Sequence, residues 1–226
     1  MIQSIYINAY IIYIMRLPLS KICSFINHMC STYRIDESHG LKHALDVYKY
    51  CRILVDHQII SYPQLLEQQN IIYTAALLHD TCDKKYMHED LGITYIKCFL
   101  EDTKCYQTHE NDIILQIIQT MSYSKVQAQG YPELGNYQQA YHIVREADLL
   151  AAYDFDRCLV FTMHHYKVDY KTAFTMAKEL YDKRMAKHVD HGLITSEKGL
   201  SLASSLLDEN IKQIAYIEAL LKHDDS

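Results

Sequence analysis

A histidine and an aspartate, His79 and Asp80, stand next to each other at the end of the apolar run Ala75-Ala76-Leu77-Leu78. Both side chains bind transition metals, and core packing alone would not select them to close such a run. A single His-Asp pair is also typical of a capped or solvated helix end. Its meaning therefore depends on whether further ligands occur elsewhere in the chain.

Further ligand types do occur in two other stretches. His39 and His43 are four residues apart, one turn of a helix, so both are candidates for a shared site. Asp148 is set among small and apolar residues, where an unpaired carboxylate would be costly to bury and where a cation would remove that cost. Asp83 follows Asp80 by three residues, which allows a second carboxylate beside the metal without making it a ligand.

The elements that must position these side chains are predicted to be helices. Gly and Pro occur only six and three times, and apolar residues recur at helical rather than alternating spacing, so we expect an all-α protein. The expected helices cover about 19–33, 41–54, 62–80, 88–101, 109–122, 136–153, 153–166, 169–189 and 196–222. Between them, 122–136 is expected to be an irregular loop over the site, because it holds two glycines and a proline.

Bulk properties limit the class of protein. The 226 residues suit one domain, and nearly half of them are apolar, enough for a substantial core. The formal charge of −6 comes without a basic cluster, so stable nucleic-acid binding is not expected, whereas a small charged ligand is compatible. Seven cysteines without a CxxC pair indicate free thiols in a reducing, cytoplasmic setting.

The first 15 residues are apolar and rich in tyrosine, but they lack a cationic leader and are shorter than the roughly 20 apolar residues that cross a bilayer. No membrane association is therefore expected. Residues 1–18 are interpreted as an N-terminal extension or additional helix, and 19–226 as one domain. Met15 could also serve as the start of the chain.

In its order of ligands, His, then His-Asp, then Asp, the sequence resembles the HD superfamily of metal-dependent phosphohydrolases. The family's first ligand precedes a valine by four residues, which selects His43 and its Val47, and its last ligand lies in Ala-Asp-x-Leu, which selects Asp148. The likeness also includes the serine-aromatic stretch 122–124 and the stretches 180–183 and 195–199. It extends over about residues 19–221.

This resemblance implies a single helical HD-domain bundle that holds one divalent metal through His43, His79, Asp80 and Asp148. Two imidazoles and two carboxylates suit Mn²⁺ best in our interpretation, and Fe²⁺, Ni²⁺, Co²⁺, Zn²⁺ or Mg²⁺ are the alternatives. The small members that this layout is most similar to hydrolyse nucleotides. The implied enzyme is therefore a nucleoside triphosphate pyrophosphohydrolase or a nucleoside monophosphate phosphatase.

Roles for other residues follow from the same hypothesis. Asp83 would orient or deprotonate the attacking water, and His39 would donate to a phosphate or protonate the leaving oxygen. Positive side chains near the motifs would offset phosphate charge. These are Lys42, Lys84, Lys85 and Arg145. A small phosphorylated substrate is the expected partner, and a homodimer is compatible with the sequence.

Two alternative functions remain at this stage. A di-iron oxygenase on the same fold would use His88 or His109 as additional ligands, and a non-catalytic module would only sense nucleotides. No glycine-rich phosphate loop is present, which argues against a kinase or a dehydrogenase. Cys82 has no obvious adjacent base and is interpreted as a packing residue.

Overall fold

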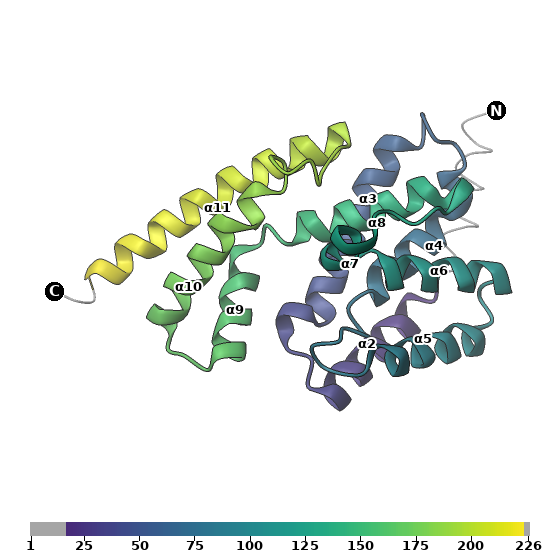
Figure 1. Ribbon diagram of the computed structural model, residues 1–226, viewed down its shortest axis with the longest axis horizontal. Coiled ribbons are helices and arrows are strands. Elements are labelled where there is room, and N and C mark those ends of the chain that lie inside the picture. The colour runs from purple at the N-terminus through teal and green to yellow at the C-terminus, as the bar shows by residue number, and fades with distance from the viewer. Residues whose placement is uncertain (1–16, 224–226) are drawn as a thin grey trace. The chain divides into compact units, whose positions relative to one another are not determined.

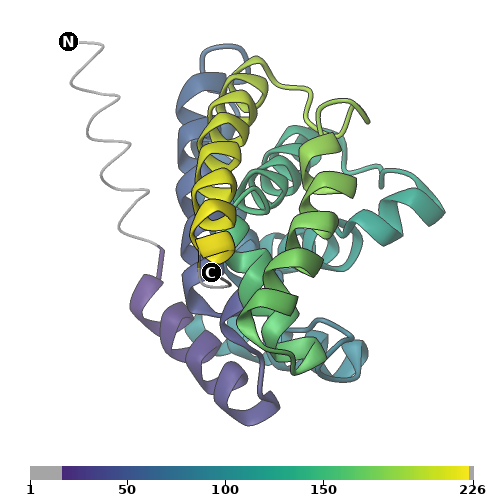
Figure 2. The same ribbon diagram turned by 90° about the vertical axis from the view of Figure 1, so that its left-hand side faces the viewer.

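The computed structural model describes residues 17–223, and over this range the chain is helical (Figure 1). These residues form ten α-helices and three short 3₁₀ helices, without a strand in that range, which confirms the all-α prediction. The view turned by 90° likewise shows helices connected by loops (Figure 2). The α-helices are α2 Leu19–Tyr33, α3 Leu41–Gln58, α4 Leu65–Leu78, α5 Glu89–Thr103, α6 Thr108–Thr120, α7 Tyr123–Gln129, α8 Gln138–Ala151, α9 Phe155–Tyr166, α10 Tyr170–Lys183 and α11 Glu197–His223. The 3₁₀ helices are η1 Glu37–His39, η2 Gly135–Tyr137 and η3 Met185–Lys187.

The chain forms two compact units. Within the described residues, unit 1 comprises 17–35 and 39–147, and unit 2 comprises 36–38 and 148–223. The division falls inside α8, so this helix begins in unit 1 and its last turn belongs to unit 2. The single domain predicted over 19–226 stays a prediction. The extension predicted over 1–18 lies outside the described residues except for 17 and 18.

The centre of unit 1 is α4, which is buried on nearly all sides. It contacts α2, α3 and α6, and α5 in turn contacts α6. A helix surrounded in this way is expected to be apolar all round rather than amphipathic, as the run from Ile71 to Leu78 is. Because α4 ends at Leu78, this buried helix fixes the position of His79 and Asp80, which follow it directly.

The turn after α4 is held against α5 by a close approach. Gly92 in the first turn of α5 is buried, and a Cβ atom placed on it would lie only 2.5 Å from Cβ of Cys82. Any larger residue at position 92 would therefore push α5 away from the turn that follows Asp80. Glycine is required here by the packing of the turn and not by an unusual backbone angle.

In unit 2, α9 and α10 form a helical hairpin (Figure 1). Both helices begin at an aspartate that caps the helix. Asp154 accepts a hydrogen bond from the backbone of Arg157, and Asp169 accepts one from the backbone of Thr172. The helix α11 is connected to this hairpin by Asn210, whose Oδ1 accepts from the backbone nitrogen of Phe155 at 3.0 Å.

The helix predictions are confirmed in outline and wrong at three places. The segment 122–136, expected to be irregular, contains α7, which has no buried residue and therefore shows no apolar periodicity in the sequence. Gly130, with φ 77°, ends it. The helix expected from residue 62 starts at Leu65. The one expected over 169–189 ends at Lys183 and continues as the tighter η3.

Candidate metal centre

The predicted ligands are positioned by three helices. His43 is the third residue of α3, His79 is the residue directly after α4, and Asp80 follows it in the turn. Asp148 lies in α8. Both histidines are buried, with exposed fractions of 3% and 8%, although no local signal ties residue 43 to residue 79. Only the contact between α3 and α4 brings the two imidazoles together.

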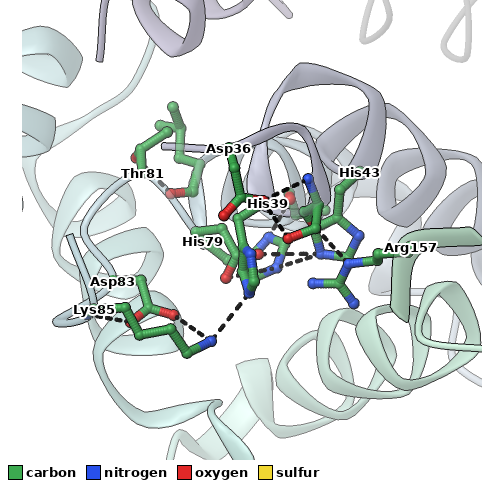
Figure 3. Close-up of polar contacts among 12 residues, drawn as sticks. Asp36, His39, His43, His79, Thr81, Asp83, Lys85 and Arg157 are labelled. Atoms are coloured by element: carbon green, nitrogen blue, oxygen red, sulfur yellow. Dashed lines mark hydrogen bonds and ion pairs between the residues drawn. The ribbon is translucent and has the colours of Figure 1, made fainter. Parts of the chain in front are cut away.

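The imidazoles of His43 and His79 lie side by side (Figure 3), and the carboxylate of Asp80 contacts both of them. The Nε2 atoms of His43 and His79 are 3.2 Å apart. Oδ2 of Asp80 lies 3.2 Å from Nε2 of His43, and Oδ1 lies 3.3 Å from Nε2 of His79. Ligands about 2.1 Å from one divalent ion at right angles to each other are separated by about 3 Å, so these spacings are those of donors that share a cation.

The tautomer of His79 is set by the backbone. Its Nδ1 lies 2.8 Å from the carbonyl oxygen of Ala76, which can only accept, so Nδ1 carries the proton and donates. In the neutral ring Nε2 then has a lone pair that faces His43 and Asp80, whereas in the protonated ring Nε2 donates to Asp80. A backbone carbonyl that orients a histidine in this way is the usual second layer of a protein metal site.

Asp148 completes a group that could hold a metal ion. One ligand atom each of His43, His79 and Asp148 lie within 4.8 Å of one another, and Asp148 is half-buried. Asp148 directly follows Ala147, the last residue of unit 1, and belongs to the same helix α8.

The carboxylate of Asp80 is held in its charged form. Burial acts to raise its pKa, but the charge of His79 and hydrogen bonds from His43 and His79 outweigh this effect and hold the pKa well below its usual value. Cys82, two residues later, behaves in the opposite way, because burial raises the pKa of its thiol to about 12. This agrees with the interpretation of Cys82 as a packing residue.

A second polar cluster flanks the ligands. Nζ of Lys85 lies 3.0 Å from Nε2 of His39 and 3.2 Å from Oδ2 of Asp83. The oxygen of Tyr86 lies 3.1 Å from Nδ1 of His39. His39 is 9% exposed, and its ring centroid is 6.4 Å from that of His43 (Figure 3). Asp83 also accepts a hydrogen bond from the backbone nitrogen of Lys85 at 2.8 Å.

The other predicted substrate contacts are not in this cluster. Lys42 pairs with Asp46 one turn further along α3, and its side chain is 70% exposed. Lys84 is exposed. Arg145 is buried in α8, with its guanidinium 5.1 Å from the ring centroid of Tyr131. Their roles as phosphate contacts stay predictions.

The additional ligands of the oxygenase alternative are likewise not part of the metal group. His88 and His109 are both exposed, and neither belongs to the group formed by His43, His79 and Asp148. His142, which also lies between the His-Asp pair and Asp148, contacts Gln138 at 3.1 Å and the ring of Tyr131.

Sequence reasoning missed Tyr86. Its hydroxyl and ring both contact His39, with ring centroids 5.6 Å apart. In a chain with 20 tyrosines, one tyrosine after a Lys-Lys pair carries no distinguishing signal. Its position close to the His-Asp pair was the only available indication.

Comparison with known proteins adds no assignment, since no family model, no curated protein and no solved structure matches the chain. None of the helices in the part of the chain described here combines the length and apolarity needed to cross a membrane.

Proposed function

We propose that this protein is a divalent-metal-dependent phosphohydrolase of the HD type that acts on a nucleotide. The observation that carries the proposal is the convergence of His43, His79 and Asp80, with two imidazole Nε2 atoms 3.2 Å apart and a carboxylate oxygen within 3.3 Å of each. Asp148 lies with the same two histidines in a group that could hold a metal ion. The order of these four residues along the chain is the one that the HD superfamily resemblance requires.

The residues present fit a divalent transition metal. Nitrogen and carboxylate donors without a thiolate favour Mn²⁺, Fe²⁺, Co²⁺, Ni²⁺ or Zn²⁺ over Ca²⁺. When bound, such an ion would supply a Lewis acid for a phosphoryl oxygen and would make a bound water more acidic. A cation would also compensate the negative charges of Asp80 and Asp148, which lie beside the two imidazoles.

The chain's own residues would supply the remaining chemistry. Asp83 follows the turn of Asp80 and is 19% exposed, so its carboxylate is accessible to a water molecule at the edge of the site. In the proposed reaction it orients that water for attack on phosphorus and receives its proton. His43 and His79 are only 3% and 8% exposed, and such low access to solvent strengthens electrostatic interactions beside them.

A metal-loading and turnover assay tests the proposal. The protein is stripped with chelator, reloaded separately with Mn²⁺, Co²⁺, Ni²⁺, Zn²⁺ or Mg²⁺, and assayed for release of phosphate and pyrophosphate from nucleoside mono- and triphosphates. We expect turnover with at least one metal, and we expect Asp80→Ala to abolish it. Asp102→Ala, which changes an exposed acid in α5, is the matched control.

The assay also separates the alternatives. Turnover that survives Asp80→Ala would contradict the proposal. Nucleotide binding that raises the melting temperature without any turnover would instead support a sensing module. Two irons per chain by elemental analysis would support the oxygenase.

A further inference from the structure

The cluster beside the ligands contains a lysine that is held in place yet reachable from solvent. Lys85 has an exposed side-chain fraction of 49%, whereas His39, whose Nε2 it contacts at 3.0 Å, is 9% exposed. An exposed lysine normally samples many conformations, and fixing it costs side-chain entropy. Here a buried imidazole on one side and Asp83 on the other define its position.

The direction of these hydrogen bonds determines the state of His39. A lysine ammonium has only donors, so Nε2 of His39 must accept from Lys85. A neutral imidazole carries one proton, which must then be on Nδ1, where it donates to the oxygen of Tyr86. In this arrangement His39 is neutral, and its Nε2 has no proton to give to a leaving group.

The same directions separate the two histidines that are one turn apart. His39 directs its Nε2 lone pair at Lys85, whereas His43 directs Nε2 at His79 and Asp80. His39 therefore contacts the lysine, whereas His43 would bind the cation. This positioning role differs from the expectation that His39 donates a proton, which stays a prediction.

A positive charge in addition to that of the metal ion would help the site to bind a phosphate. One divalent ion would balance the two carboxylates of Asp80 and Asp148, so the ligand group would be neutral and would not by itself attract a doubly charged phosphate. Lys85 places a positive charge beside His39, and Asp83, 3.2 Å from its Nζ, offsets part of that charge. A lysine is a common phosphate-binding residue and acts as a point charge with several donors.

We propose that Lys85 binds the phosphate group of the substrate next to the metal site and that His39, fixed by Tyr86, is the positioning residue that holds Lys85 there. This inference rests on the proposed function. The ligand class is a phosphate or diphosphate anion, and Lys85, not the neighbouring Lys84, is the residue that the contacts place to recognise it.

Inorganic phosphate is the probe that tests Lys85. Binding to manganese-loaded protein is measured by calorimetry for wild type, Lys85→Met and the control Lys97→Met, which changes an exposed lysine in α5. We expect Lys85→Met to raise the dissociation constant for phosphate by roughly 10- to 100-fold, the usual value of a charge-assisted hydrogen bond. Manganese affinity should stay within about threefold of wild type, because Lys85 is not a ligand.

His39→Leu and His39→Gln test the positioning role. The side-chain oxygen of glutamine can accept from Lys85, whereas leucine cannot, so we expect leucine to weaken phosphate binding and glutamine to restore most of it. KM for the nucleotide should rise more than kcat falls. If both variants lost kcat equally and the basic limb of the kcat pH profile disappeared, His39 would be a proton donor and the positioning role would be overturned.

The outcomes distinguish this inference from the function on which it rests. If wild type binds manganese and hydrolyses nucleotides, but Lys85→Met binds phosphate as Lys97→Met does, the role of Lys85 fails and the phosphohydrolase proposal stands. A loss of stability in Lys85→Met with unchanged phosphate affinity would also overturn it. If wild type binds neither manganese nor phosphate, both proposals fail.

Discussion

Two regions of the molecule bury histidines in opposite ways. In unit 1, His43 and His79 face the charged carboxylate of Asp80. In unit 2, His188 is 3% exposed and lies edge-on to the ring of Tyr153, with centroids 5.6 Å apart. Burial is the main cause that lowers the pKa of His188 to about 4, and Arg184 adds to this effect.

The difference lies in what each imidazole has beside it. A carboxylate at hydrogen-bond distance compensates a positive charge, so the group around Asp80 is suited to a cation. Aromatic rings offer His188 no such compensation, and its hydrogen bond to the backbone of Leu149 and the charge of Asp148 only partly oppose the effect of burial. Histidines that look alike in the sequence thus belong to a candidate metal site in one unit and to a neutral core in the other.

The largest effect is expected from removing a ligand. His79→Ala should lower manganese affinity by roughly 100-fold or more, since a four-ligand site derives several kcal/mol from each ligand. His188→Phe should change it by less than about threefold, because His188 is not one of the ligands and a phenylalanine can keep its edge-on packing with Tyr153. Calorimetric titration with Mn²⁺ measures both. Equal losses of manganese affinity in the two variants would contradict the difference between the two histidine environments.

The pH dependence of stability should sharpen the comparison. The pKa of His188 is about 4 in the folded protein and about 6.5 in the unfolded chain, so between these values the unfolded chain binds a proton that the folded protein does not. Its contribution is complete above pH 6.5 and is lost as the pH falls toward 4, by about 3 kcal/mol in total. Urea unfolding of the chelator-treated protein at several pH values measures this loss, which His188→Phe should remove.

Asp80 should contribute in a separate pH window. Its folded pKa lies well below its ordinary value, so its contribution is present above the unfolded pKa of about 4 and is lost only as the pH falls below that value. Asp80→Asn should therefore flatten the stability profile below pH 4 and leave the slope between pH 6.5 and 4 intact. If Asp80→Asn changed that upper slope as His188→Phe does, the two groups would not titrate independently.

Metal binding should raise the free energy of unfolding by slightly less than the amount expected for His188. A ligand present at about 100 times its dissociation constant adds about 2.7 kcal/mol when it binds only the folded state. Thermal melts with Mn²⁺ and with chelator should therefore differ by several degrees for wild type. Asp148→Asn should reduce this difference strongly, and an undiminished shift would show that Asp148 is not a ligand.

The smallest effect is expected at Lys42. Its Nζ lies 2.5 Å from Oδ2 of Asp46, one turn along α3, but its side chain is 70% exposed. Solvent screens such a pair, so Lys42→Ala should change the free energy of unfolding by less than about 0.5 kcal/mol. Denaturant titration at low and moderate salt checks this, and a loss of more than about 1 kcal/mol would show that the pair is not a surface interaction.

Much of the helical layout could be predicted because it is encoded locally. The apolar spacing from Leu41 to Leu54 predicts α3 and puts His43 beside its buried face, and both are found. Where a helix buries nothing, as α7 does, the pattern is absent and the prediction was wrong. The tighter turn of η3 likewise has no signature that distinguishes it from a continued α10.

By itself, the sequence determined the candidate ligands: a His-Asp pair at the end of an apolar helix, and further acids and histidines in an order that resembles that of metal-dependent hydrolases. The choice of His43 over His39 was already indicated by the resemblance, and the structure shows His43 against His79. The tertiary structure alone decided that Lys85 rather than Lys84 meets His39 and Asp83. Neighbouring residues of the same type are chemically equivalent along the chain. They are distinguished only by the direction in which a helix or turn presents each side chain to partners tens of residues away.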